Sequence, residues 1–177
     1  MNAPGPVDEQ KRMGMGMMVL AWIVLLGLGA LFFTDVLERQ FNPNQSLETR
    51  YGAEGVREVI LQRNRFGHYV SSGTINGEPV TFMLDTGATG VAVPLDVAQR
   101  LQLQRGRAYP TQTANGITTS YATTLREVAL GDIALQDVPA AIAPGLADGQ
   151  ILLGMSFLKH IEFTQRGDTL ILRQYPG

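Results

Sequence analysis

The chain has 177 residues, of which 45% are hydrophobic and 17% charged, with a formal net charge of −2 and no cysteine. This length suits one domain of ordinary size plus an additional segment. The small net charge provides no electrostatic reason to expect nucleic acid as a partner, and the lack of cysteine excludes disulfides, zinc–thiolate sites and cysteine nucleophiles.

The first element in chain order is an unbroken apolar run over residues 13–33. About twenty such residues cross the hydrocarbon core of a bilayer as a helix. Lys11 and Arg12 precede the run, and acidic residues follow it. Positive-inside bias therefore predicts that residues 1–12 are cytoplasmic. We expect a single-pass protein of the inner (cytoplasmic) membrane, with the remainder of the chain periplasmic or otherwise extracytoplasmic.

A cleaved signal peptide is the alternative interpretation of this run, because Gly27-Leu28-Gly29 has the small-x-small pattern of a cleavage site. The apolar run continues through Phe33, however, which is longer than a typical signal-peptide core. An uncleaved anchor is therefore favoured. Residues 34–56 are polar and contain Pro43, so we expect a linker in which the helix persists for about a turn before coil follows.

From residue 57 the sequence changes to short strands separated by turns, with Asn76-Gly77 and Asn115-Gly116 as hairpin signals. Helical spacing occurs over residues 94–103, and one helical turn is expected over residues 156–160. The predicted strands cover residues 58–63, 68–75, 79–84, 91–93, 109–113, 117–124, 127–130, 133–142, 151–154, 161–164 and 169–173. This pattern predicts an all-β barrel or sandwich for residues 57–177.

The candidate catalytic residue is Asp85, which follows the predicted strand 79–84 directly and opens the triplet Asp85-Thr86-Gly87. An acid placed directly after a buried strand is unusual, because burying an unpaired carboxylate is costly. An ordinary turn is the simpler explanation of the triplet alone, since chance produces it in about one chain in thirty of this length. The surrounding sequence therefore decides its significance.

Three segments together resemble the retropepsin-like aspartic proteases, and most closely their bacterial single-pass membrane members. Residues 84–88 look like the active-site loop of that family, residues 113–116 are similar to its flap, and residues 152–158 resemble the element beneath the active-site loop. The resemblance covers residues 57–173 and implies a single-lobe closed β-barrel with one short helix. Thr89 stands where many viral members carry a second Asp.

The resemblance also implies roles for individual residues in peptide hydrolysis. Asp85 would be one of two carboxylates that share a proton and act as base and acid. Thr86 would hydrogen-bond across the pair, and Gly87 would let the backbone approach the carboxylate. The expected substrate-binding residues are Ala88, Ala114, Asn115, Gly116 and Ile117, and the expected supports of the site are Leu153 and Gly154.

One chain contains a single such loop, because Asp168-Thr169-Leu170 lacks the glycine and Asp148-Gly149 lacks the hydroxyl residue. The second carboxylate must then come from another chain, and a twofold axis would place the same loop twice. We therefore expect a homodimeric, membrane-anchored aspartic endopeptidase that acts on a protein or peptide.

The remaining candidates favour simpler explanations. His68 and His160 have no partner at ligand spacing, so no metal or other cofactor is expected. Residues 154–158 lack the second glycine of a nucleophile elbow, which argues against a serine hydrolase. The three arginines within residues 100–107 fit a solvated surface. Two further functions stay open: a peptide- or protein-binding module with the protease fold but no catalysis, and a membrane-tethered structural domain.

Overall fold

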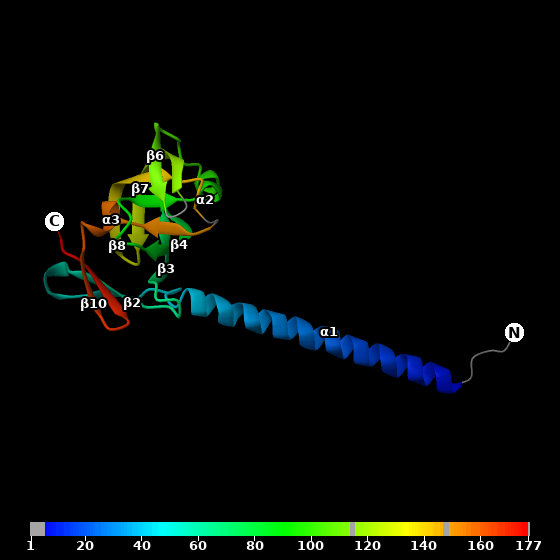
Figure 1. Ribbon diagram of the computed structural model, residues 1–177. Helices are drawn as coiled ribbons and strands as arrows, with labels where there is room; N and C mark the ends of the chain where they lie inside the picture. The colour runs from blue at the N-terminus through cyan, green and yellow to red at the C-terminus, as the bar shows by residue number, and fades with distance from the viewer. Residues whose placement is uncertain (1–5, 114–115, 147–148, 177) are drawn as a thin grey trace. The chain divides into compact units, whose positions relative to one another are not determined.

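The computed structural model describes residues 6–113, 116–146 and 149–176. Backbone contacts divide the chain into two compact units, Met1–Arg39 and Gln40–Gly177. The helix α1 extends over Pro6–Phe41, and its portion from Gly14 onward is long and apolar enough to cross a membrane (Figure 1). Because an N-terminal signal sequence has the same properties, α1 is compatible with either a membrane span or a signal sequence.

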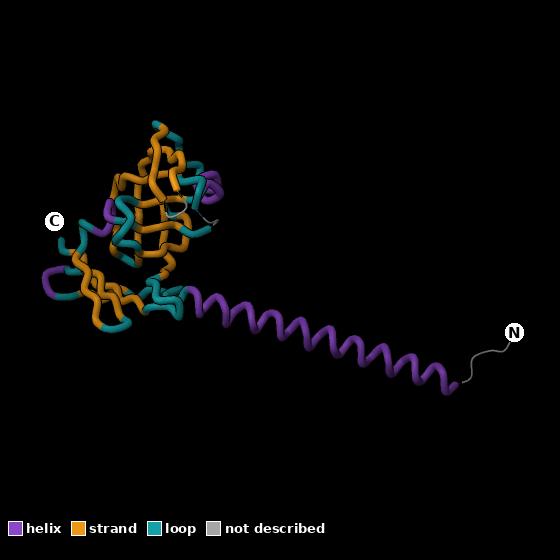
Figure 2. The backbone as a smooth tube through the Cα atoms, viewed as in Figure 1, coloured by secondary structure: helices purple, strands orange, loops and turns teal. Residues whose placement is uncertain are grey.

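The second unit consists mainly of strands (Figure 2). Its larger sheet has seven strands in the order β3-β4-β9-β5-β8-β7-β6. The sheet curls into a barrel because β3 also pairs with β7, through Thr74 with Ala129 and Ile75 with Val128. The strands are β3 Val70–Ile75, β4 Glu78–Leu84, β5 Val91–Val93, β6 Ala108–Thr113, β7 Gly116–Leu130, β8 Ile133–Ile142 and β9 Ile151–Leu153.

A smaller sheet with the order β1-β2-β11-β10 completes the unit. It brings strands from the beginning and from the end of the unit's sequence side by side (Figure 1). All of its pairings are antiparallel. Its strands are β1 Thr49–Tyr51, β2 Arg57–Gln62, β10 Glu162–Arg166 and β11 Thr169–Gln174. The strand β1 lies in residues 34–56, where the sequence predicted coil, and its pairing with β2 supplies the order that its own composition does not.

Three short helical segments connect the strands: the 3-10 turn η1 at Ala53–Gly55, α2 at Leu95–Arg100 and α3 at Met155–Leu158. Helix α2 is shorter than the predicted 94–103, because the backbone turns to a positive φ of 52° at Gln102. The helical turn predicted near residue 156 is present as α3.

One hydrophobic core joins both sheets. Alternate residues of each strand face the same side, and the buried positions follow this rule: Val59 and Leu61 on β2 and Leu170 and Leu172 on β11 lie in the same cluster as the barrel residue Phe82. Burial of such side chains supplies about 1.5–3 kcal/mol each. The barrel and the smaller sheet therefore form one packed domain.

Asn44 fastens the segment before β1 to the domain. Its side-chain amide donates to the carbonyls of Gln62 and Val70 at 2.9 and 2.7 Å, and its Oδ1 accepts the Gln62 N–H at 2.7 Å. Asn44 is only 5% exposed, and a buried amide needs such partners. Residues 42–44 consequently belong to the folded domain.

The strand β7 is continuous where the sequence predicted two strands, 117–124 and 127–130. Both halves pair with β8, through Leu125 with Val138 and Glu127 with Gln136, and Arg126 alone is skipped. Opposite this skip, Asp137 has a φ of 52°. The register of β7 with β8 is therefore interrupted at Arg126, but pairing with β8 continues on both sides of the interruption. The predicted break between two strands is only this local irregularity within one strand.

Candidate active site

Asp85 lies at the end of β4, beside two strands that come from later in the chain. Strand β9 lies between β4 and β5, parallel to β4 through Leu84 with Leu153 and antiparallel to β5 through Ala92 with Leu152. The loop after β4 therefore closes over the end of β9. This arrangement places the Asp85 carboxylate at the edge of the barrel, whereas the strand β4 that precedes it forms part of the barrel wall.

Hydrogen bonds from backbone N–H groups hold the first part of the loop 85–90. The Asp85 N–H donates to the Leu153 carbonyl at 3.2 Å, and the Ala88 N–H donates to the Asp85 carbonyl at 3.2 Å. The Gly87 N–H donates to Oδ1 of Asp85 at 2.8 Å. This last bond orients the carboxylate, because a hydrogen bond from a backbone N–H to a carboxylate oxygen is directional.

Position 154, beneath this loop, requires glycine because carbonyl oxygens of the loop occupy the space that a side chain would need. A Cβ at this position would lie 2.3 Å from the Gly90 carbonyl oxygen and 2.5 Å from that of Ala88. The next residue, Met155, donates its N–H to the Ala88 carbonyl at 2.9 Å. The Leu153-Gly154 segment thus lies directly beneath the loop, where the sequence analysis expected a supporting element.

Ser156 is a further support that the sequence analysis did not identify. Its Oγ accepts the N–H of Val91 at 2.9 Å and lies against Gly90, where a Cβ would be 3.5 Å away. The bond connects α3 to the point where the loop enters β5. A serine two residues after a required glycine was the available signal, but nothing in the sequence indicates its partner, which is 65 positions away.

The exposure of the triplet differs from that of the strand that carries it. Phe82 is fully buried, Asp85 is half-buried, and Thr86 and Gly87 are exposed. A carboxylate at this boundary is accessible to a ligand or to a second protein chain. In the described part of the chain, no group of three or more His, Cys, Asp or Glu side chains could hold a metal ion.

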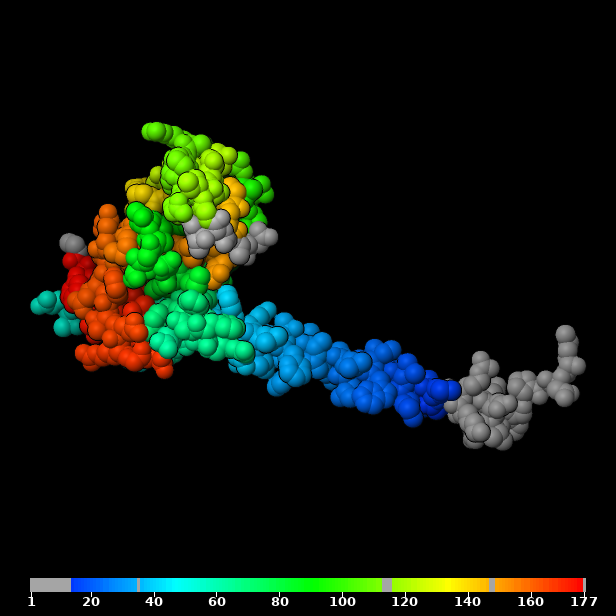
Figure 3. Space-filling model, viewed as in Figure 1, coloured from blue at the N-terminus to red at the C-terminus, as the bar shows by residue number. Residues whose placement is uncertain are grey.

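The hairpin of β6 and β7 contains the other predicted binding residues. The strands pair from Ala108 with Tyr121 to Thr113 with Gly116. Gly116 has a φ of +107°, a conformation that favours glycine, and Ile117 is 77% exposed. Ala114 and Asn115 lie outside the described residues. In Figure 3, atoms coloured for β6 and the beginning of β7 gather at one end of the domain.

The fold and the loop together define a class of protein. A single-lobe barrel with Asp-Thr-Gly at the end of an inner strand is the arrangement of retropepsin-like aspartic proteases. The chain is similar to a solved retropepsin-like aspartic protease from Rickettsia conorii, with 32% identity, a TM-score of 0.58 and coverage of 73% of this chain and 96% of that one. The predicted all-β retropepsin-like fold is confirmed.

Sequence comparison then identifies the family. Residues 71–160 match the model of the gag-polyprotein putative aspartyl protease family, and the chain belongs to that family. An uncharacterised protein from Sinorhizobium sp is 34% identical over 68% of this chain and 54% of its own length. An uncharacterised protein from Rickettsia prowazekii is 31% identical over 66% of this chain and 52% of its own length. The chain thus spans about half the length of these curated relatives.

Proposed function

We propose that this protein is an aspartic endopeptidase that hydrolyses peptide bonds as a homodimer, with Asp85 of each protomer supplying one catalytic carboxylate. The observation that carries the proposal is the hydrogen bond from the Gly87 N–H to Oδ1 of Asp85, 2.8 Å long, in a loop anchored on β9. An acid held in this way is oriented before substrate arrives, and such preorganisation is a requirement of acid–base catalysis.

Two carboxylates on one axis cannot both ionise, so the pair retains one proton. The charged Asp85 would take a proton from a water molecule, whose oxygen attacks the peptide carbonyl carbon. The protonated Asp85 of the other protomer would give its proton to the carbonyl oxygen. The resulting tetrahedral diol then collapses: the C–N bond breaks, the nitrogen leaves with the proton held by the pair, and one diol hydroxyl returns its proton to the other carboxylate, so that the pair again holds one proton.

The dimer is proposed because each chain offers a single Asp-Thr-Gly loop. The exposure of Thr86 and Gly87 supports a contact between two such loops. The Thr86 hydroxyl would hydrogen-bond across the axis, and Gly87 would allow close backbone approach. A C2 dimer brings identical residues together at its axis, which is the symmetry that a two-carboxylate site requires.

The substrate would lie between this loop and the β6–β7 hairpin. Ala88 on the loop, and Gly116 and Ile117 on the hairpin, would contact the peptide, together with Ala114 and Asn115. The high exposure of Ile117 supports this proposal, because an exposed apolar side chain can be covered by a ligand.

The apolar helix would anchor the enzyme as a single-pass protein of the inner membrane, through residues 13–33, with residues 1–12 in the cytoplasm. Residues 34–56 would connect this anchor to the catalytic domain, 57–177, on the extracytoplasmic side. Anchoring confines chains to two dimensions and raises their effective concentration, which favours a dimer. Mass spectrometry of the membrane-extracted protein would separate an intact anchor from a cleaved signal sequence.

The decisive experiment compares Asp85→Asn with Asp168→Asn in the full chain in detergent micelles, using a fluorogenic peptide library at several pH values. Asp168 lies in the β10–β11 turn and pairs with Arg63 at 3.2 Å. We expect Asp85→Asn to lower cleavage by about 10²–10⁴-fold and Asp168→Asn to leave it unchanged. Normal cleavage by the Asp85 variant would eliminate the mechanism.

A mixing experiment tests the shared site directly. Excess Asp85→Asn chains should suppress wild-type activity, because each mixed dimer has a single ionisable carboxylate at its site. In a separate dilution series of the wild-type protein, specific activity should fall as the dimer dissociates. If activity is absent while both the wild-type and Asp85→Asn chains bind the same peptides, the protein is a binding module with the protease fold.

A further inference from the structure

A pocket of about 670 Å³ lies on the barrel at the base of the β6–β7 hairpin, away from the Asp85 loop. Strand β7 has β8 along one edge and two partners in succession along the other. Pairing with β6 ends at Tyr121, and pairing with β3 begins at Val128. Ala122 still bonds to residues 106–107 on that edge and Glu127 to Asn76, so the residues between them, 123–126, have no strand partner there. The pocket occupies this gap.

The backbone of β7 faces the gap with free hydrogen-bonding groups. Ala122 is the last residue bonded on this side, since its carbonyl accepts the Gly106 N–H at 2.8 Å and its N–H donates to the Arg107 carbonyl at 2.9 Å. Alternate residues of a strand direct their backbone groups to the same edge. Thr124 therefore directs its N–H and C=O into the gap, where the described chain supplies no strand to pair with them.

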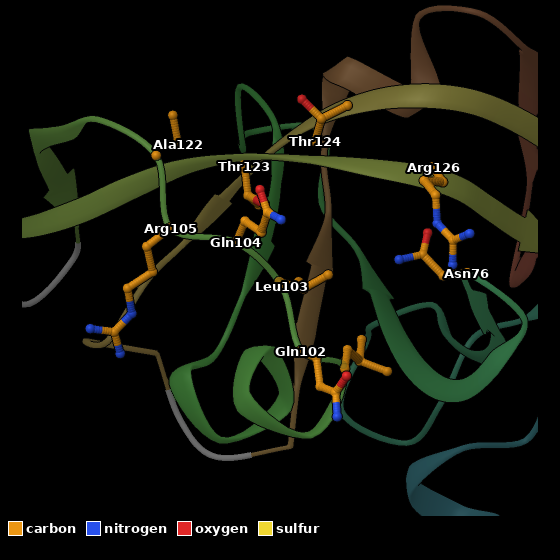
Figure 4. A pocket seen from close by; sticks show the side chains of 11 residues that line it. Asn76, Gln102, Leu103, Gln104, Arg105, Ala122, Thr123, Thr124 and Arg126 are labelled. Carbon is orange, nitrogen blue, oxygen red and sulfur yellow. The ribbon is translucent and has the colours of Figure 1, made fainter.

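The side chains around this edge are basic and amide-bearing. The lining includes Arg105 and Arg126, and the described residues that line it include no Asp or Glu. Neither guanidinium has an ion-pair partner within residues 6–113, 116–146 and 149–176, although Arg105 lies over the Tyr121 ring at 5.2 Å. Figure 4 shows the two arginines at opposite ends of the pocket, with Gln104 and Thr123 between them.

We propose that this pocket is a second binding site, for an extended peptide segment that carries acidic side chains. The segment would add a short strand to the free edge at Thr124, and its carboxylates would bind Arg105 at one end and Arg126 at the other. The edge between Ala122 and Glu127 spans about 17 Å, and an extended five-residue peptide spans about 13 Å between its first and last Cα atoms. Strand addition provides affinity through backbone bonds, and the two charges provide selectivity.

The site extends the interpretation of the arginines within residues 100–107, which the sequence placed on a plain solvated surface. Arg105 enters the pocket because the loop 101–106 lies along β7 instead of projecting into solvent. The proposal does not depend on catalysis at Asp85, since no residue of the Asp85 loop lines the pocket.

The test measures binding of a labelled probe, acetyl-Glu-Val-Thr-Val-Glu-amide, by fluorescence anisotropy. The protein is the full chain in detergent micelles with Asp85→Asn, so that cleavage cannot consume the probe. Arg105→Gln and Arg126→Gln should each weaken binding by about two- to fivefold, the range of exposed ion pairs. Arg166→Gln, an exposed arginine on β10 outside the pocket, should leave binding unchanged.

Two altered probes separate the charges from the backbone pairing. The probe with Gln in place of both Glu should bind at least fivefold more weakly, and added salt should remove this difference. A probe with N-methylated alternate amides keeps both carboxylates but cannot form a strand, and it should also bind weakly. The site would be overturned if the variant carrying both Arg105→Gln and Arg126→Gln bound the Glu probe as tightly as the protein with both arginines, or if the Gln probe bound as tightly as the Glu probe. Undiminished binding of the N-methylated probe would overturn the strand pairing and leave an anion site alone.

Discussion

The Asp85 loop and the β6–β7 hairpin are built by opposite means, although the resemblance assigns both to one active site. The loop is fixed from below by backbone atoms of β9 and α3, so closely that Gly154 has no room for a Cβ. The hairpin is held by pairing of its own two strands and carries Ile117 at 77% exposure.

This difference matches what each region would have to do. A catalytic carboxylate must be placed within fractions of an ångström, and long-range backbone contacts provide that precision. A surface that receives peptides must instead have apolar area free to be covered. We therefore expect changes under the loop to reduce stability and activity together, and changes on the hairpin to reduce activity alone.

The largest effect is expected from Gly154→Ala. The new Cβ would overlap the carbonyl oxygens of Ala88 and Gly90, so the loop must move. Unfolding by urea should show a loss of about 3 kcal/mol or more, with loss of peptide cleavage. The matched control is Gly52→Ala, where the nearest atom is 3.5 Å away and the φ is negative. Equal stabilities of the two variants would contradict the close approach.

Asn44→Ala tests a fixed point made by a side chain instead of by backbone approach. Removal of the amide leaves the Gln62 N–H and the Val70 carbonyl without their partner. The unfolding free energy should fall by about 2–3 kcal/mol, measured by the same urea titration. Gln45→Ala, at the exposed neighbouring position, is the control. If Asn44→Ala lowered the unfolding free energy by no more than Gln45→Ala does, the Asn44 side chain would not contribute to the stability of the domain.

Ser156→Ala should have an intermediate effect, because it deprives the N–H of the buried residue Val91 of its acceptor. We expect a loss of about 1–2 kcal/mol and a lower kcat with little change in KM, since the loop loses its connection to α3. Ser46→Ala on the exposed segment before β1 provides the comparison. Unchanged kinetics would show that the link supports the fold without positioning the loop.

The smallest change in stability is expected for Ile117→Ser on the hairpin. An exposed side chain contributes little to the fold, so the unfolding free energy should stay within about 0.5 kcal/mol. Peptide cleavage should nevertheless fall about fivefold in kcat/KM, which corresponds to about 1 kcal/mol of lost apolar contact. Phe66→Ser, at a 58% exposed aromatic on another turn, should alter neither quantity. Equal kcat/KM for the two variants would remove Ile117 from the substrate site.

Local signals in the sequence identified most of the strands. Asn76-Gly77 predicted the β3–β4 turn correctly, and Asn76 and Gly77 both have positive φ there. The prediction of a short element at 151–154 beneath the loop agrees with β9. The coil predicted before residue 57 was wrong at β1, because three residues form a strand there only through the pairing of Thr49 with Val59.

The sequence by itself determined the chemistry that this protein can attempt: an Asp-Thr-Gly triplet after an apolar strand, a single copy per chain, and an apolar helix before the domain. These properties are carried by neighbouring residues and by periodicity, which need no knowledge of distant partners. The tertiary structure decided which segments, distant in the sequence, lie next to one another in the domain. It placed β9 under Asp85, bonded Ser156 to Val91, and left one edge of β7 open beside two arginines. Such contacts join residues tens of positions apart, so they depend on the free energy of the whole packed domain.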